Sequence, residues 1–200
     1  RMITGFLSPT KGNISVCGHD VSEYPIEIKE KIGYVPEGAP LYGEMTVINF
    51  LKFIANIRKI PKNKINDAIY NVIKKLGLEL VLYQQVETLS KGYKRRVGLS
   101  QAIIHDPDVL ILDEPTDGLD PNQKHEVRKL IKEMASTKAI IISTHILEEV
   151  DAVCTRAMII AKGRMIVDKS PKDLLIGSPD GASLDDVFRT LTIGNPGDNL

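Results

Sequence analysis

The sequence predicts an α/β fold built on a mainly parallel sheet with crossover helices and an inserted helical segment. Two observations lead to this prediction. Short apolar strands at 109–112 and 139–143 are each followed by a helical pattern, and this alternation is typical of parallel strands joined by crossover helices. Upstream of them, apolar residues recur at spacings of three and four over 44–105, which indicates the inserted helices.

Length and composition favour one ordinary globular domain. The chain has 200 residues, of which 42% are hydrophobic and 26% are charged, as in folded rather than disordered proteins. Its 26 basic and 26 acidic residues cancel, so we expect no nucleic-acid partner. The two cysteines, Cys17 and Cys154, lie far apart and indicate reduced thiols in a cytosolic protein. No apolar run approaches the roughly 20 residues that span a bilayer.

Short elements precede the inserted helices. Residues 1–7, RMITGFL, have the pattern of a helix interior, and without an initiator methionine we expect the N-terminal part to be truncated. Extended segments follow at 13–18 and 31–36. Two amphipathic helices come next, one behind a Thr46 cap and one ending before Gly77. Their predicted buried faces are Val47, Phe50, Leu51, Ile54 and Ile57 in the first, and Ile65, Ile69, Val72, Ile73 and Leu76 in the second.

A third helix is predicted from Ser90 toward Ala102. Serine is a favoured N-cap, and the backbone N–H groups at such a helix start, helped by the helix dipole, can bind an anion. Gly92 would let the backbone approach a phosphate closely. The basic residues at 94–96, KRR, are expected on the exposed face of this helix.

The second half of the chain continues the alternation. The strand at 109–112 contains only apolar residues, which is typical of a strand buried on both faces of a parallel sheet. A helix is predicted behind Asp120, which has the character of an N-cap followed by proline. Residues 157–167, AMIIAKGRMIV, predict a hairpin that turns at Lys162 and Gly163.

Two adjacent carboxylates, Asp113 and Glu114, directly follow the strand at 109–112. Ligands of parallel sheets bind beyond the carboxyl ends of the strands, so these side chains are placed where a substrate would lie. Successive residues of an extended chain point to opposite sides, which favours separate roles. Asp113 suits a hard cation such as magnesium, and Glu114 suits a water molecule that it orients or deprotonates. His145, at the end of the strand 139–143, is a third catalytic candidate.

Four segments, in this order, resemble the motifs of the ATP-binding cassette (ABC) ATPases. LSKGY at 89–93 is similar to the signature motif LSGGQ, and VLILDEP at 109–115 to the Walker B strand with its catalytic glutamate. GLD at 118–120 is similar to the D-loop, and STH at 143–145 to the switch histidine. The resemblance covers nearly the whole chain, and four motifs in the family's order are a very specific signal.

The resemblance implies a P-loop NTPase-like fold and an ATPase whose cofactors are ATP and Mg²⁺. Asp113 would then help to hold magnesium, Glu114 would act on the attacking water, and His145 would contact the terminal phosphate.

The resemblance also implies a second nucleotide-binding subunit in a head-to-tail dimer. Ser90 and Gly92 would reach the nucleotide held by that subunit, and Asp120 would lie at the interface between the two.

Three features depart from the family pattern. The signature has Lys91 and Tyr93 where the family usually has glycine and glutamine. Glu37, in GYVPEGAPLY, replaces the Q-loop glutamine, and its carboxylate remains a candidate ligand for the nucleotide site and for magnesium. The P-loop pattern G-x-x-x-x-G-K-[ST] does not occur in the 200 residues. We expect it to precede Arg1, and the fragment that begins there to be inactive alone.

The segments PEGAPLY, LSKGY and LDDVFRTLT resemble bacterial exporters of the gliding-motility and multidrug type. In these the ATPase is a separate polypeptide from its transmembrane permease. The resemblance therefore implies a cytoplasmic subunit, peripheral at the inner face of the cell membrane, that couples ATP hydrolysis to transport by the permease. Leu41, Tyr42 and Met45 would face that partner.

The expected domain organisation is a single nucleotide-binding domain, 1–200, that lacks its P-loop. Residues from about 40 to 105 would form the helical subdomain with the signature motif. Residues from about 106 to 170 would form the catalytic core with Walker B, D-loop and switch histidine, and about 171–200 a C-terminal extension.

Two other functions compete with the transporter. One is a soluble ABC ATPase of translation or DNA repair, but repair members carry a long coiled coil where only 52 residues separate Glu37 from Ser90. The other is a non-catalytic regulatory module that lacks the P-loop. Residues upstream of Arg1 would discriminate it from an enzyme.

Overall fold

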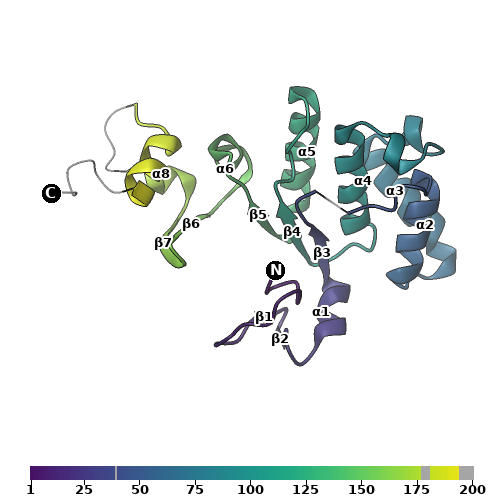
Figure 1. Ribbon diagram of the computed structural model, residues 1–200, viewed down its shortest axis with the longest axis horizontal. Helices are drawn as coiled ribbons and strands as arrows, with labels where there is room; N and C mark the ends of the chain where they lie inside the picture. The colour runs from purple at the N-terminus through teal and green to yellow at the C-terminus, as the bar shows by residue number, and fades with distance from the viewer. Residues whose placement is uncertain (39, 177–180, 194–200) are drawn as a thin grey trace. The chain divides into compact units, whose positions relative to one another are not determined.

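The computed structural model describes residues 1–38, 40–176 and 181–193 (Figure 1). They divide into two compact units, the first ending at Ser143 and the second beginning at Thr144. The first unit contains, in chain order, β1 (Ser15–Val16), β2 (His19–Asp20), α1 (Pro25–Lys31), β3 (Ile32–Val35), α2 (Val47–Ile57), α3 (Ile65–Leu76), α4 (Lys91–Ile103), β4 (Val109–Asp113), α5 (Pro121–Met134) and β5 (Ala139–Ser143). One-turn 3-10 helices lie at Lys62–Lys64, Glu79–Val81 and Val86–Thr88.

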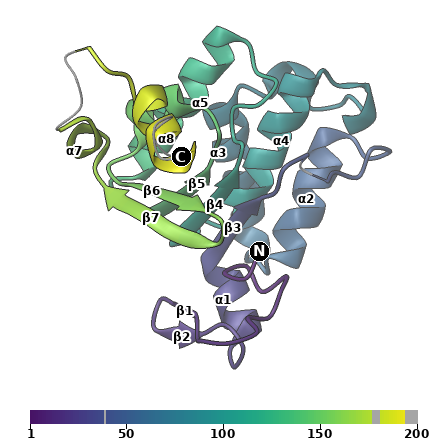
Figure 2. The same cartoon turned by 60° about the vertical axis from the view of Figure 1, so that its left-hand side comes forward.

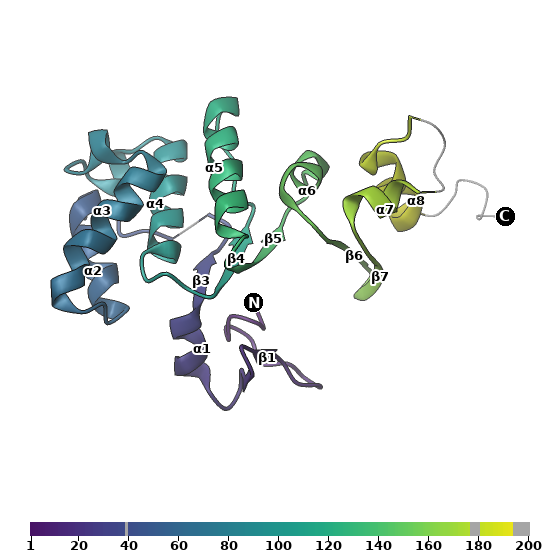
Figure 3. The ribbon, with the colours of Figure 1, turned by 180° about the vertical axis from the view of Figure 1, so that it is seen from behind.

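Strands β3, β4 and β5 form a parallel sheet in the order of the chain. Val35 pairs with Leu112, and Asp113 pairs with Ser143, so the three strands end at the same edge. The parallel sheet predicted from the alternating pattern is thereby confirmed. Helices α2, α3 and α4 stand between β3 and β4 in the chain and pack on one another, as Figures 1 and 3 show. They are the inserted helices that the sequence predicts.

The two amphipathic helices begin and end where their caps predict. The Thr46 hydroxyl accepts a hydrogen bond from Asn49 N at 3.4 Å, and Gly77 closes α3 in the left-handed conformation. The predicted apolar faces are largely buried: Ile54 and Ile65 are half-buried, and Ile57 is 57% exposed. Ile57 is the last residue of α2, and its side chain lines a pocket against α1 instead of the helical core.

Strand β4 is buried on one face and only half-buried on the other. Leu110 and Leu112 are 0% exposed, whereas Val109 and Ile111 on the opposite face are half-buried. The second face packs against a separate apolar cluster formed by Val16, Val21, Ile28 and Ile32. This small cluster covers the second face incompletely, so the expectation of full burial on both faces is wrong for the described residues.

Residues 1–6 form a capped turn rather than the expected helix. Phe6 N donates to Arg1 O at 2.9 Å, and Gly5 N donates to Met2 O at 3.1 Å. Gly5 has a positive φ of 73°. This is the hydrogen-bond pattern of a Schellman cap, the usual C-terminal end of a helix. The sequence expectation therefore missed the stop at Gly5, which ends helical geometry within this segment.

The signature helix α4 lies very close to β3. A Cβ atom built on Gly33 would be 2.1 Å from the carbonyl oxygen of Ala102 and 2.7 Å from the Leu110 side chain. Such distances exclude any side chain at this position. Gly33, the glycine in IGYV, thus allows α4 to pack directly on β3, the strand that precedes Glu37.

The second unit contains α6 (Leu147–Val153), β6 (Ala157–Ala161), β7 (Arg164–Lys169), α7 (Pro171–Leu175) and α8 (Leu184–Ile193). Strands β6 and β7 form the predicted antiparallel hairpin, seen as green arrows in Figure 2. Its turn is at Lys162 and Gly163, both with positive φ, as the tight hairpin requires. Among all described residues, no helix is long and apolar enough to cross a membrane.

A partly buried histidine lies near the amino end of β3. His105 Nε2 is 3.2 Å from the carbonyl oxygen of Ile32, so this nitrogen donates, and Nδ1 is buried without a hydrogen-bond partner among the described residues. Burial, reinforced by the positive charge of Arg58, lowers the pKa of His105 to about 4. The folded protein therefore holds this imidazole in its neutral form.

We predict that this protein loses stability as the pH falls from about 6.5 to about 4. An unfolded histidine has a pKa near 6.5, so the unfolded state takes up a proton in this window while folded His105 does not. The free energy of unfolding should fall by about 3 kcal/mol at most. Chemical denaturation at about pH 7 and about pH 5 measures the loss.

His105→Gln keeps a donor for Ile32 but does not titrate, so it should flatten this pH dependence. Replacing His125, an exposed histidine of α5, by glutamine is the matched control. An unchanged pH dependence in His105→Gln would contradict the assignment.

Candidate functional site

Three predicted site residues, Glu37, Asp113 and Glu114, lie at or just beyond the ends of strands at one edge of the parallel sheet. Glu37 is exposed and comes two residues after β3, Asp113 is the half-buried last residue of β4, and Ser143, paired with Asp113, ends β5. The structure thus places Glu37, Asp113 and Glu114 beyond the carboxyl ends of adjacent strands, where parallel sheets bind ligands.

Glu114 adopts a left-handed backbone conformation with φ of 49°. A non-glycine residue in this region is strained and persists only where its surroundings hold it. Here the Glu114 N–H donates to Ser143 O at 2.8 Å, and its carbonyl oxygen accepts a hydrogen bond from the Arg95 side chain. The main chain leaves the extended conformation of β4 between Asp113 and Glu114. The two carboxylates are therefore attached to residues with different backbone conformations.

The guanidinium of Arg95 holds this turn from the side of α4. It donates to the carbonyl oxygens of Asp113, Glu114, Pro115 (3.3 Å) and Pro36 (3.2 Å). The residue is only 7% exposed. Burial lowers the pKa of Arg95, while nearby carboxylates, including those of Asp113 and Glu114, raise it.

The expectation that the basic run 94–96 lies on an exposed face is therefore wrong. Arg95 is buried, and Arg96 is half-buried and donates to the last carbonyls of α3, those of Leu76 and Gly77. A run of three basic residues indicates an exposed face, whereas the helical spacing of Arg95 indicates, more weakly, a buried one. Arg95 lies three residues after Gly92 and four before Leu99, on the buried face of α4.

The carboxylate oxygens at this edge suit a cation whose other ligands are water and phosphate oxygens. The Asp113 carboxylate accepts no hydrogen bond from the described residues. Across the same residues, no group of three or more His, Cys, Asp or Glu side chains could hold a metal ion. A single carboxylate at an exposed edge fits Mg²⁺, because this ion keeps waters and phosphate oxygens as its other ligands.

The start of α4 is tied to the loop that follows β4. Ser90 caps the helix by accepting from Tyr93 N at 3.4 Å, as predicted. Lys91 forms an ion pair with Asp117 at 2.9 Å. A Cβ on Gly92 would lie 2.3 Å from Gln123 Oε1 of α5, so a larger residue there would require the Gln123 side chain to move. Lys91, a departure from the signature pattern, therefore has a structural partner within the chain.

Asp120 caps α5 as predicted, because its carboxylate accepts from Gln123 N at 2.9 Å. Pro121 follows as the first helical residue. The side chain of Asp120 is exposed. Its position thus has a local structural explanation, which does not depend on any partner subunit.

His145 belongs to the second unit, in the turn that leads into α6. There the Thr144 hydroxyl accepts from Ile146 N at 3.1 Å and donates to Glu149 Oε2 at 3.0 Å. Glu149 is only 1% exposed. The neighbours of His145 are thus fixed by a buried carboxylate that the sequence analysis did not single out, and the role of His145 stays a prediction.

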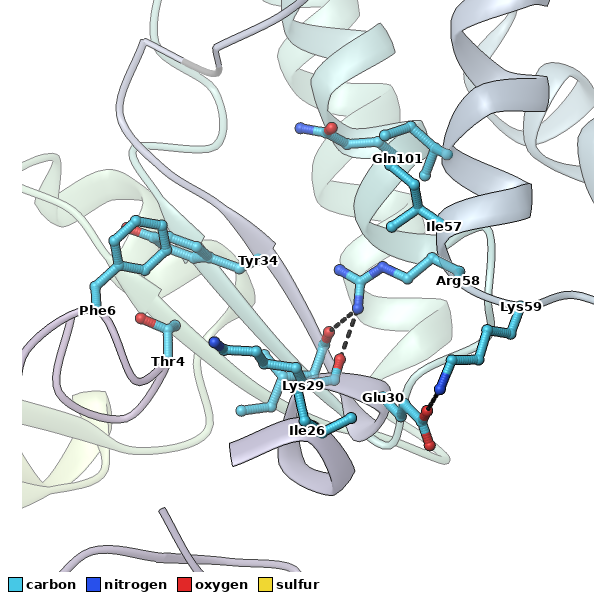
Figure 4. A pocket seen from close by; sticks show the side chains of 12 residues that line it. Thr4, Phe6, Ile26, Lys29, Glu30, Tyr34, Ile57, Arg58, Lys59 and Gln101 are labelled. Carbon is cyan, nitrogen blue, oxygen red and sulfur yellow. Dashed lines mark hydrogen bonds and ion pairs between the residues drawn. The ribbon is translucent and has the colours of Figure 1, made fainter. Parts of the chain in front are cut away.

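Two pockets of the first unit differ in character. One of about 340 Å³ lies beside the Glu37 loop, and its lining includes Lys91, Lys94, Arg95 and Asp117. Another of about 540 Å³ is lined mainly by apolar groups around Phe6, Tyr34 and Ile57, as shown in Figure 4. Neither pocket is lined by a residue predicted for catalysis or for binding nucleotide and metal.

Comparisons with known proteins agree with the motif pattern. The family model described as ABC transporter matches residues 1–117. The chain is 36% identical over 184 residues to an uncharacterized ABC transporter ATP-binding protein, YhcH, of Bacillus subtilis, which covers 90% of this chain and 59% of the relative. It is 31% identical over 189 residues to the Nod factor export ATP-binding protein I of Cupriavidus metallidurans, covering 94% of this chain and 62% of the relative. The chain thus spans less than two thirds of both curated relatives.

Solved structures resemble the chain over nearly its full length. An ATP binding subunit of an ABC transporter superposes with a TM-score of 0.85 at 29% identity, covering 95% of this chain and 80% of that one. CbiO1 of Clostridium perfringens, part of the ABC transporter complex CbiONQ, gives 0.76 at 28% identity, covering 98% and 77%. The predicted fold class, including its likeness to P-loop NTPases of the ABC type, is confirmed.

We predict that Asp120→Ala lowers the free energy of unfolding by about 1 kcal/mol, the usual loss for a removed N-cap. Asp120→Asn retains a capping oxygen and should lose far less, so it is the matched control. Urea denaturation of the three proteins measures the difference. Equal losses in both variants would show that the cap does not stabilise α5.

Proposed function

Because this chain belongs to the ABC transporter family, we propose that it is the ATP-binding and ATP-hydrolysing subunit of a transporter. A separate membrane permease would carry the substrate, and the subunit would lie in the cytoplasm at the inner face of the membrane. The observation that carries the proposal is the pair Asp113–Glu114 at the carboxyl edge of the sheet, with the Glu114 backbone held in a left-handed conformation.

In this function the two carboxylates have separate tasks. Asp113 would bind Mg²⁺ together with phosphate oxygens and water. Bound Mg²⁺ would neutralise the charge that develops on the phosphates. Glu114 would orient the attacking water and accept its proton. The hydrogen bonds that hold its main chain would limit the movement of this residue that the step requires. Glu37, exposed on the loop after β3, would reach the metal or this water from the side.

The remaining site residues would contact a bound nucleotide at other points or lie at the interface between the two subunits. His145 would contact the terminal phosphate. Ser90 and Gly92 lie at the start of α4, where N–H groups and the helix dipole attract an anion. We infer that this anion is the nucleotide of a second subunit, and that Asp120, exposed at the start of α5, lies at the interface of the head-to-tail pair.

The permease would dock on the helical side of the Glu37 loop. Tyr42 is 57% exposed, and its ring packs on the Phe53 ring with centroids 5.3 Å apart. Leu41 and Met45, beside it, are half-buried. A rigid aromatic surface of this kind is typical of protein interfaces. The relatedness to CbiO1, which is part of a transporter complex, supports a membrane partner, and relatedness to a Nod factor export protein supports export.

We propose that residues 1–200 belong to one nucleotide-binding domain. The helical subdomain, about 40–105, would contact the permease and present the signature motif. The catalytic core, about 106–170, would provide Walker B, the D-loop and His145, and about 171–200 would be an extension.

We predict that Glu114→Gln lowers ATP hydrolysis about 10²- to 10⁴-fold in the full-length gene product, the range for loss of a general base. ATP binding should survive, because glutamine retains shape and hydrogen bonding. Asp113→Asn should instead weaken magnesium-dependent ATP binding, and added magnesium should recover part of its loss but none of the loss in Glu114→Gln. ATP affinity and steady-state phosphate release measure both effects. Rapid hydrolysis by Glu114→Gln would refute the proposed roles.

We predict that Ser90→Arg prevents ATP-driven dimerisation while the monomer still folds. An arginine at the start of α4 would occupy the space that the partner's nucleotide needs. Light scattering with and without ATP, in the Glu114→Gln background that retains nucleotide, measures dimerisation, and circular dichroism monitors folding. Ser90→Thr keeps the hydroxyl cap and is the control. A Ser90→Arg protein that dimerises normally would contradict the proposed contact.

A further inference from the structure

One buried cation connects the signature helix to the catalytic turn. Arg95 stands on α4, five residues after its cap Ser90, and its guanidinium donates to carbonyl oxygens of two different loops. One is Pro36, directly after β3 and next to Glu37. The others belong to the turn at 113–115, which carries both site carboxylates.

A planar guanidinium suits this position better than any other side chain. It has five N–H donors in a fixed fork, so it can satisfy several carbonyl groups at once. A carbonyl left without a donor in so buried a place would be unfavourable, which fixes the turn to the arginine. Because Glu114 is in a left-handed conformation, its main chain depends on such external contacts.

The exposed start of α4 makes further contacts with the segment that follows β4. The Lys91–Asp117 ion pair joins the start of the helix to the same β4–α5 connection, and Gly92 lies close to Gln123 in the first turn of α5. The Lys91–Asp117 pair is exposed and contributes little on its own. Lys91 and Arg95 nevertheless both connect the first turns of α4 to the segment that follows β4.

We propose that Arg95 is a positioning residue that couples the location of α4 to the geometry of Glu114 and of the Glu37 loop. A movement of α4, such as one caused by a ligand at Ser90 or by a partner on the helical subdomain, then changes the placement of the carboxylate that acts on water. The inference rests on the proposed ATPase function and adds a route by which that activity is regulated.

Arg58 offers a matched control with the same chemistry in a different place. Its guanidinium also donates to backbone carbonyls, those of Lys29 at 2.6 Å and Ile32 at 3.3 Å, and burial lowers its pKa as well (Figure 4). These carbonyls lie at the amino end of β3, whereas Arg95 binds beyond its carboxyl end. Arg58 thus stabilises the same strand away from the catalytic turn.

The experiment compares Arg95→Lys, Arg95→Met and Arg58→Met in the full-length gene product. We expect both Arg95 variants to lower kcat for ATP hydrolysis about 10²-fold, the effect of displacing a catalytic group by about 1 Å. ATP affinity should stay within about twofold, because Arg95 donates to the main-chain carbonyl of Asp113 and not to its carboxylate, and Asp113 is also held by its pairing in the sheet. Added guanidinium ion, at concentrations too low to denature, should restore part of the kcat of Arg95→Met. Arg58→Met should keep kcat and lose only stability.

A second readout does not require enzymatic activity. Amide hydrogen exchange at Glu114, whose N–H donates to Ser143, should accelerate in Arg95→Met by more than exchange at core amides of β4. In Arg58→Met the exchange at Glu114 should follow the core. Arg95 variants with unchanged kcat, or with equal losses of kcat and ATP affinity, would overturn the proposal. If the wild-type protein hydrolyses no ATP, the proposed function fails, and Arg95 positioning is then tested by hydrogen exchange alone: it fails if the Glu114 exchange in Arg95→Met follows the core.

Discussion

The architecture of the site depends on one buried guanidinium placed among main-chain carbonyls. Arg95 is 7% exposed and donates to carbonyl oxygens at the ends of β3 and β4. Burying a charge is unfavourable unless hydrogen bonds replace its hydration. The four carbonyl oxygens provide that replacement, and the carboxylates nearby favour the charge further. The charge, in exchange, joins the loop after β3 to the strained turn after β4.

The close fit of α4 on the sheet makes this arrangement possible. Gly33 in β3 lacks a side chain where α4 approaches the sheet, and a Cβ atom there would be 2.1 Å from the carbonyl oxygen of Ala102 in α4. Since a side chain at Gly33 would push α4 outward, this position sets how far the guanidinium reaches. The signature helix is therefore both a surface that presents Ser90 and a support for Glu114.

The apolar pocket in Figure 4 and the polar edge of the sheet illustrate two kinds of binding space. An apolar cavity binds by excluding water, whereas a phosphate site is built from N–H groups, a cation and a few carboxylates. A pocket of about 340 Å³ lies beside the Glu37 loop and includes Lys91, Arg95 and Asp117. The predicted site residues and the apolar pocket therefore lie in different places in this fold.

The sequence alone determined the alternation of strands and helices from β4 onward, the inserted helices and the caps, and it predicted the site carboxylates. These features depend on local physics: helical spacing behind Thr46, capping by Ser90 and Asp120, and an apolar strand that ends at Asp113. Only the tertiary structure decided that Arg95 is buried, that Glu114 is left-handed and that Lys91 pairs with Asp117. These features join segments about 20 residues or more apart, and no local pattern specifies which carbonyl a buried donor will reach. A run of basic residues is usually exposed to solvent, but the close packing of α4 on the sheet buries Arg95.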